Sequence, residues 1–333
     1  MPASMVSRFD DPDVFAAAIR ASRTEIAVTE RGRFAAKLIR IDLHRLWMQR
    51  GEETLGRISH VDCVPGRAII WFSTKAGPTV VTDRTEVPAG AIVRNSDGYS
   101  CFQRSTGGWH KGSMSLPIAD MEALGATYSG SDLTPPRDAL ICTPLPAALE
   151  RLQRLHAAAG HLAEYAPEVI AHPEAARGLE QALTAAMADC FSIADCRSSG
   201  AGNGRHNVIM RRFFAILEAN PDGVLYVPEI CGKIGVSKRT LTTYCNEALG
   251  MSPMRYFKLR QLNLARRALA AGDPAATTVT RIATAYGFWE LGRFAVAYRT
   301  LFGERPSVTL ARPRGAAPIP PDRINSPASS LFA

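Results

Sequence analysis

Long apolar runs are missing from this chain of 333 residues. No segment approaches the eighteen consecutive apolar residues of a membrane-spanning helix. Residues 1–15 also lack the basic start and the apolar run of a secretory signal. We therefore expect a cytoplasmic protein with no membrane partner.

Residue patterns for catalysis and metal binding are also scarce. The seven cysteines are an odd number without a CxxC pair, which predicts reduced thiols rather than a disulfide framework or a zinc site. His44, His60 and His110 are isolated from one another, which argues against a histidine-based metal centre. The chain has no nucleophile elbow, Gly-rich phosphate loop or HExxH motif. We expect no catalytic residue, no metal and no cofactor.

Acidic residues are under-represented in only one part of the chain. Residues 207–312 contain fifteen Lys and Arg against seven Asp and Glu, whereas residues 1–206 contain 22 against 23. The net charge of +8 therefore comes from the C-terminal third. Such clustering is typical of a domain that binds a polyanion, because each neutralised phosphate releases counterions. A solvated basic face without a partner is the alternative.

Changes in composition divide the chain and predict an α+β protein. Residues 1–196 form a β-rich domain, in which short apolar runs alternate with Gly, Pro and Asp turns from about 34 to 115 and helical spacing begins at about 144. Asp11 or Asp13 can cap a short helix near the start. Residues 197–206 are rich in Gly, Ser and Asn and predict a flexible linker. The segment 207–313 is helical, and the Pro- and Ser-rich tail 314–333 is expected to be disordered.

Apolar stripes at steps of three and four residues predict two helices after residue 144. The second stripe predicts either a helix packed on its own barrel or a helix that pairs with its copy in a homodimer. Its members are Leu179, Ala182, Leu183, Ala186, Met187, Cys190 and Phe191.

The segment 227–249 has the pattern of a helix-turn-helix. Val227, Ile230 and Ile234 predict a short helix, a turn containing Gly235 follows, and Ser237 is placed to cap a second helix. The inner face of the second helix is Leu241, Cys245 and Leu249. Its outward face holds side chains that can donate to phosphates or read base edges, with Glu247 as the only acid. These outward residues are Lys238, Arg239, Thr240, Thr242, Thr243 and Asn246.

The same pattern returns after a long predicted helix over 254–272. Val279, Ile282 and Ala283 predict another short helix, Gly287 turns the chain, and a last helix follows with Phe294, Tyr298 and Leu301 facing inward. Two such units on one rigid helix can enter successive major grooves, about 34 Å apart along the duplex.

These segments resemble the AraC/XylS family of bacterial transcription regulators. The resemblance covers about residues 211–313 and rests on IGVSKRTL, GMSPMRYFKLRQLNLARRAL and VTRIATAYGFWELGRFAVAYRTLFGERP. It implies binding to double-stranded promoter DNA, contact with RNA polymerase, activation of transcription, and a cupin-like N-terminal domain that senses a small effector or forms a homodimer. By position, the resemblance adds Glu290, Leu291, Arg293 and Val296 as groove-facing residues of the second unit.

Departures from the family pattern predict unequal roles for the two units. Cys245, Val296 and Arg305 stand where the family usually has a large aromatic residue, a cation, and a Ser or Thr. Because Leu291 and Val296 offer few hydrogen-bonding groups, we expect the first unit to supply most base-specific affinity, with Arg293 and Arg299 acting on phosphates.

Two other functions remain open for the N-terminal domain. It could be an interaction module that binds no small ligand, or a cupin-type enzyme fused to a DNA-binding domain. An effector pocket is expected to have aromatic walls and few polar groups, although the same aromatics serve equally well in a core. The candidate pocket residues are Trp71, Phe72, Trp109 and His110.

Overall fold

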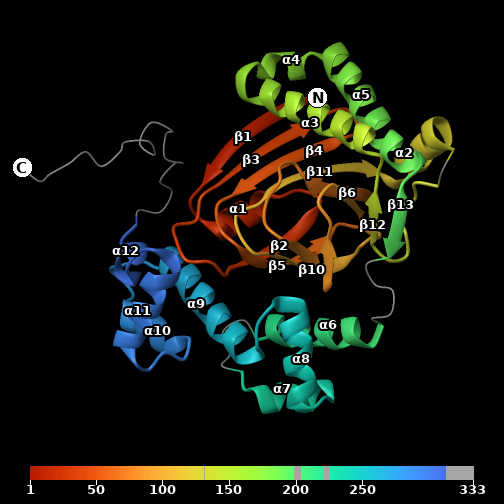
Figure 1. Ribbon diagram of the computed structural model, residues 1–333. Helices are drawn as coiled ribbons and strands as arrows, with labels where there is room; N and C mark the ends of the chain where they lie inside the picture. Colours follow the sequence, from red (N-terminus) through yellow and green to blue (C-terminus); the bar gives the residue numbers. More distant parts are fainter. Residues whose placement is uncertain (131, 199–203, 221–224, 313–333) are drawn as a thin grey trace, which may run out of the picture.

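The computed structural model describes residues 1–130, 132–198, 204–220 and 225–312, and it confirms the α+β class. A barrel-like pair of antiparallel sheets forms the N-terminal part, and the described residues of the C-terminal part form helices without a strand (Figure 1). The first sheet has the order β1 (Ala3–Phe9), β3 (Ala36–Asp42), β4 (Trp47–Glu53), β11 (His110–Pro117), β6 (Arg67–Ser73), β9 (Ile92–Arg94), β12 (Leu140–Thr143), β13 (Asp195–Ser198). The second has the order β2 (Ser22–Val28), β5 (Arg57–Cys63), β10 (Ser100–Ser105), β7 (Val80–Thr82), β8 (Thr85–Val87).

The strands β4 and β11 direct polar side chains toward the second sheet and apolar ones away from it. Successive side chains of a strand point to opposite faces. Gln49, Glu53 and Lys111 therefore lie between the sheets, whereas Met48 and Met114 join the apolar cluster beneath the helices. In β4 and β11 the polar face therefore points into the barrel, whereas the apolar face of a barrel strand usually does.

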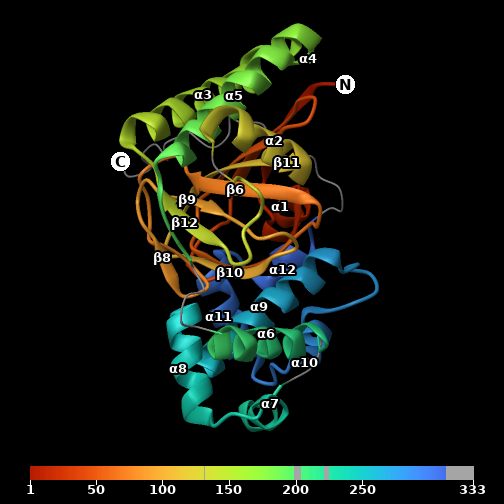
Figure 2. The same cartoon turned by 90° about the vertical axis from the view of Figure 1, so that its right-hand side faces the viewer.

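Helices cover the outer face of the first sheet. They are α3 (Pro146–Tyr165), α4 (Pro167–Ala171) and α5 (Pro173–Ser192), which lie across the sheet at the top of Figure 2, beside α2 (Ile118–Leu124) and a π-helical turn, Gly125–Ser129. Leu183, Ala186 and Met187 of the second predicted stripe are fully buried in the cluster that includes the sheet residues Ile70 and Met114. The stripe therefore packs on its own barrel, which was one of the two interpretations of the sequence; the other was pairing with its copy in a homodimer.

One prediction about the cysteines is wrong. Cys142 and Cys196 form a disulfide, whereas the other five cysteines are free and buried. The two residues are direct partners in the antiparallel register of β12 and β13. Because 54 residues separate them and neither strand was predicted, the sequence offered no indication of the pairing.

The predicted linker is also longer than the structure allows. Strand β13 includes residues 197 and 198, and helix α6 (Gly204–Glu218) begins before the predicted boundary at 207. The remaining linker positions, 199–203, and the predicted tail from 314 lie outside the described residues. The further helices are α7 (Val227–Ile234), α8 (Lys238–Leu249), α9 (Pro253–Ala271), α10 (Val279–Ala285), α11 (Leu291–Phe302) and α12 (Pro306–Leu310).

The helical part docks directly on the second sheet through an apolar cluster. The ring of Phe214 on α6 stacks on Phe102 of β10, with 3.5 Å between centroids, and Phe102 stacks in turn on His60 of β5. Ile58 and Phe102 belong to the same cluster as the buried residues of α6, α7 and α8. The two parts therefore share a core.

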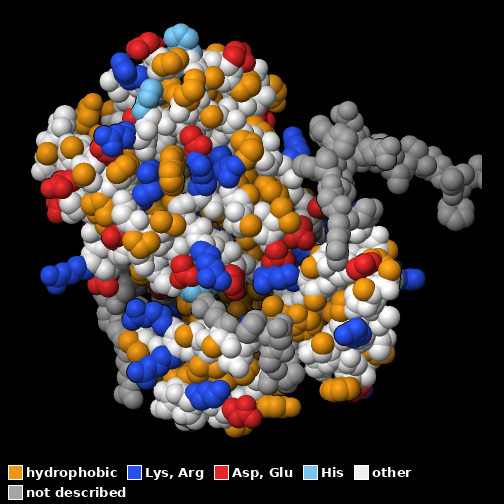
Figure 3. All heavy atoms as spheres, turned by 180° about the vertical axis from the view of Figure 1, so that it is seen from behind, with side chains coloured by type: hydrophobic (Ala, Val, Ile, Leu, Met, Phe, Trp, Pro, Cys, Tyr) orange, Lys and Arg blue, Asp and Glu red, His pale blue; other side chains and the backbone are white. Residues whose placement is uncertain are grey.

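Charged and polar groups complete the docking around α9 and α1 (Pro12–Ala18). Arg266 and Arg267 of α9 pair with Asp11 (3.0 Å) and Asp13 (2.6 Å). Figure 3 shows side chains of both charges together along this boundary. The amide of Asn263 also bonds both backbone groups of Val28 at the edge of the second sheet, donating to its oxygen (3.4 Å) and accepting from its nitrogen (3.1 Å).

Candidate nucleic-acid interface and barrel cavity

The first helix-turn-helix consists of α7 and α8. Gly235 ends α7 at φ +78°, a left-handed conformation that glycine adopts without strain. The Ser237 hydroxyl accepts from Thr240 N at 3.1 Å and caps α8, which confirms its predicted role. The predicted inner face, Leu241, Cys245 and Leu249, is fully buried.

The outward face of α8 is open to solvent at the positions that the sequence singled out. Lys238, Arg239, Thr243 and Asn246 are exposed, and Thr240 and Thr242 are half-buried. Glu247, the acid of this face, pairs with Arg84 of the β7–β8 turn in the barrel. The pairing removes the only negative charge of α8 from the exposed cationic and polar surface.

The second helix-turn-helix consists of α10 and α11. Gly287 turns the chain at φ +82°, and Phe294, Tyr298 and Leu301 are buried as expected. Arg293 pairs with Glu290 at 2.8 Å within the same turn. The exposed surface of α11 is therefore mostly apolar around one ion pair, with Arg299 near its end. The predicted residues on this surface are Glu290, Leu291, Arg293, Val296 and Arg299, all exposed.

Helix α9 joins the two units and holds them beneath the barrel (Figure 1). Ser252 caps this helix, and Tyr256, Leu262, Ala265 and Leu269 are buried along it. The first two residues belong to different apolar clusters, Tyr256 with the first unit and Leu262 with the second. A single rigid helix thus fixes the spacing between α8 and α11.

One exposed aromatic near the second unit escaped the sequence analysis. Trp289 lies in the turn before α11 and is 79% exposed. Two of the predicted groove-facing residues, Glu290 and Leu291, follow it directly and are exposed as well. The sequence feature that could have identified Trp289 is its position directly before Glu290, a predicted groove-facing residue.

A cavity of about 60 Å³ lies between the two sheets of the barrel. Of the four predicted pocket residues, Trp71 lines it. Phe72, the next residue of β6, faces the opposite side and packs edge-on against His156 of α3. Trp109 is buried behind Trp71 with 5.5 Å between ring centroids, and His110 lies 3.8 Å from Glu52.

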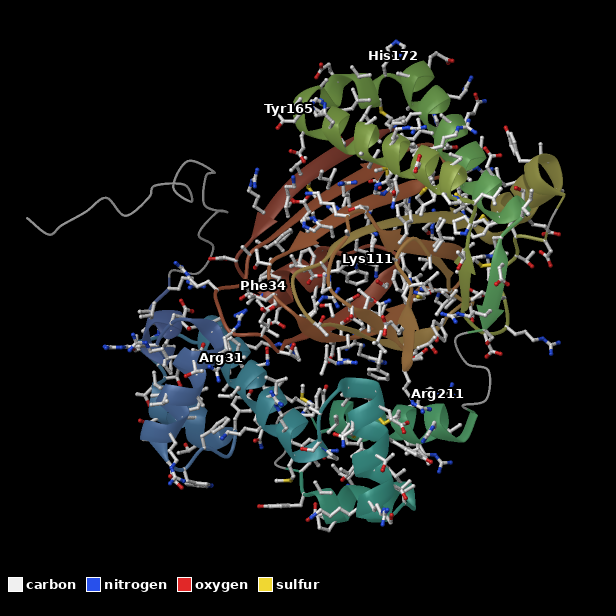
Figure 4. All side chains as sticks on the ribbon, in the orientation of Figure 1. Arg31, Phe34, Lys111, Tyr165, His172 and Arg211 are labelled. Atoms are coloured by element: carbon white, nitrogen blue, oxygen red, sulfur yellow. A yellow bond between two sulfur atoms is a disulfide. The ribbon has the colours of Figure 1, made fainter. Side chains whose placement is uncertain are left out.

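The cavity is lined by charged residues that the sequence analysis did not select. Arg57 donates to Glu53 at 2.6 Å, and both side chains are 3% exposed. Lys111 projects into the barrel in Figure 4, and its ammonium group donates to Gln103 Oε1 at 3.1 Å. Burial, followed by the charge of Arg57, lowers the pKa of Lys111 to about 8. The missed signal was the alternation of polar residues at 111, 113 and 115, which places all three on one face.

Within the described residues, no group of three or more His, Cys, Asp and Glu could hold a metal ion. Similarly, no described helix combines the length and apolar character that a membrane span requires.

Comparison with known proteins agrees with this geometry. A family model described as a helix-turn-helix domain matches residues 230–312. The probable thc operon regulatory protein of Rhodococcus erythropolis is 39% identical over 102 residues, which are 31% of each chain. The matched part of the chain thus spans less than a third of that relative.

Two further relatives are matched over most of their own length. The XylDLEGF operon transcriptional activator 2 of Pseudomonas putida is 33% identical over 105 residues, which cover 32% of this chain and 67% of the relative. A solved structure of a probable AraC family transcriptional regulator from Rhodopseudomonas palustris is 37% identical and covers 32% of this chain and 99% of its own, with a TM-score of 0.29. Because the Pseudomonas putida activator is 33% identical and is matched over two thirds of its own length, the chain belongs to the AraC/XylS family of transcription regulators.

Proposed function

We propose that the protein is a sequence-specific regulator that binds double-stranded promoter DNA in the cytoplasm and activates transcription. The observation that carries the proposal is the pair of helix-turn-helix units on α9, with the exposed cationic and polar face of α8 on one of them. Side chains of this kind contact phosphates and base edges in a major groove. The names of the matched Pseudomonas putida relatives, which are operon activators, support activation over repression.

The proposal includes a sensing role for the barrel and no enzymatic role. Helix α1 supports it because this helix contacts both the cavity and the DNA-binding part. Phe15 and Ile19 line the cavity, while Asp11 and Asp13 hold α9. An effector that displaces Phe15 would therefore change how firmly α9 is held. Contact with RNA polymerase and a homodimer belong to the proposal through the family resemblance.

The two recognition helices are expected to differ in the kind of contact they lose on mutation. Arg239→Ala on α8 is expected to weaken binding by about 1–3 kcal/mol and to relax the preference at one base position, as loss of a base contact does. Arg299→Ala on α11 is expected to weaken specific and scrambled sites alike, as loss of a phosphate contact does. Gel-shift titrations of both variants against the specific site and its single-base variants measure the difference.

Equal losses at the specific and scrambled sites for both variants would contradict this division. The site itself is found by chromatin capture of the tagged protein in its native host. Sharp peaks that share two half-sites about one helical turn apart are the expected result. Diffuse capture without a shared motif would overturn the proposed function.

A further inference from the structure

Lys111 has no carboxylate partner, in contrast to the other cations that line the cavity within the described residues. Arg57 pairs with Glu53, and Arg20 pairs with Asp42. The ammonium group of Lys111 instead lies over two indole rings, 4.9 Å from the centroid of Trp71 and 5.1 Å from that of Trp109. With a pKa of about 8, this group stays mainly charged at neutral pH. The cavity therefore contains one positive charge that forms no ion pair with a described carboxylate, because the nearby Glu53, which raises the pKa of Lys111, is paired with Arg57.

Gln103 supplies a second donor at the same place. Its side chain is 1% exposed, and Oε1 accepts the hydrogen bond from Lys111. The other amide atom, Nε2, is buried and donates to no described residue. Buried donors are nearly always paired, because an unmet donor loses its hydration without compensation. One acceptor placed beside Lys111 Nζ and Gln103 Nε2 would satisfy both groups.

The remaining walls of the cavity are apolar and leave limited space. Phe15 and Leu38 lie on one side, and Val61 and Ile69 on another. A volume of about 60 Å³ accommodates roughly four to six groups the size of water. A short apolar body fits such walls, whereas a long chain or a second charged group does not.

We propose that the barrel binds a small organic carboxylate, whose carboxylate accepts from Lys111 Nζ and Gln103 Nε2 and whose short apolar body lies against Phe15, Leu38 and Ile69. This inference rests on the proposed function, because it names the class of effector that the barrel senses. A neutral ligand of the same shape would leave the charge of Lys111 without a counter-ion. Phe15 connects the bound acid to α1, whose Asp11 holds α9.

Calorimetric titration of the full chain tests the proposal. The probes are propionate, butyrate and isobutyrate, each paired with its uncharged primary amide. We expect at least one acid to bind and its amide to bind at least tenfold more weakly. Lys111→Met is expected to weaken the acid about 10- to 100-fold, since a hydrogen bond to a charged group is lost. Gln103→Glu is expected to abolish binding, because the new side-chain carboxylate would occupy the position of the ligand's carboxylate.

Lys75→Gln is the matched control, because it removes the charge of an exposed lysine near the same sheet. This variant is expected to bind the acid as the unmodified chain does, and circular dichroism verifies that every variant is folded. The proposal is overturned if no acid binds, if the amides bind as tightly as the acids, or if Lys111→Met leaves affinity unchanged. Specific DNA binding is measured on the same samples. If specific DNA binding is retained but no acid binds, this inference alone is wrong. If an acid binds but DNA binding shows no sequence preference, the proposed function is wrong.

Discussion

Asp11→Ala is expected to lower the free energy of unfolding by about 3–5 kcal/mol, because the Asp11 carboxylate both caps α1 and pairs with Arg266. Its Oδ1 atom accepts from the backbone nitrogens of Asp13 (2.8 Å) and Val14 (3.1 Å) and caps α1. Its Oδ2 atom lies 3.0 Å from Arg266, whose side chain is only 7% exposed. The alanine variant therefore loses a helix cap and leaves a buried guanidinium without its partner. Urea unfolding of the full chain measures the change.

Asp13→Ala provides the comparison on the same helix. Asp13 pairs with Arg267, whose side chain is 45% exposed, so solvent screens the loss. We expect about 1 kcal/mol or less for this variant. Hydrogen exchange should show faster opening of α9 in Asp11→Ala than in Asp13→Ala. Equal destabilisation by the two variants would show that the buried pair does not hold the helical part in place.

Glu53→Ala is expected to destabilise the barrel by about 3–5 kcal/mol. Glu53 and Arg57 are both buried in the cavity wall, and the variant would leave Arg57 and Lys111 as two unpaired cations there. Repulsion between them adds to the cost of the unpaired guanidinium. Thermal unfolding monitored by circular dichroism is expected to show a lower Tm.

The double variant Glu53→Ala/Arg57→Ala isolates the contribution of the charge. Removing both partners leaves no unpaired guanidinium, so part of the lost stability is expected to return. Glu174→Ala is the control at the surface, since its partner Arg177 is 61% exposed. This control is expected to change stability by no more than about 0.5 kcal/mol. A double variant less stable than Glu53→Ala would show that packing, and not charge, dominates at this position.

Local patterns predicted the DNA-binding helices well because those helices depend on local rules. The cap at Ser237, the turns at Gly235 and Gly287 and the buried stripes of α8 and α11 all follow from spacing of four residues or less. These features are set by backbone geometry and by apolar periodicity. They were accordingly visible in one sequence.

The barrel and its cavity depend on contacts that no local pattern contains. Strands β1, β2, β12 and β13 were missed, and so was the cross-strand pairing of Cys142 with Cys196. In β4 and β11 the polar residues face the cavity, whereas the expectation of aromatic pocket walls with few polar groups selected Trp71 and Phe72 instead of Lys111. The docking of α9 on α1 joins residues about 255 positions apart, a separation that spacing cannot reveal.

The amide of Asn263 performs for Val28 the role that a neighbouring strand usually performs. Among the described residues β2 is the last strand of its sheet, and Asn263 of α9 bonds Val28 on the side where no described strand pairs with it. Uncovered sheet edges recruit strands from other molecules. Any state in which α9 leaves the barrel would uncover this edge while it frees the recognition helices. A chain held in that state away from DNA is therefore expected to aggregate, so its solubility would limit how long it can remain active.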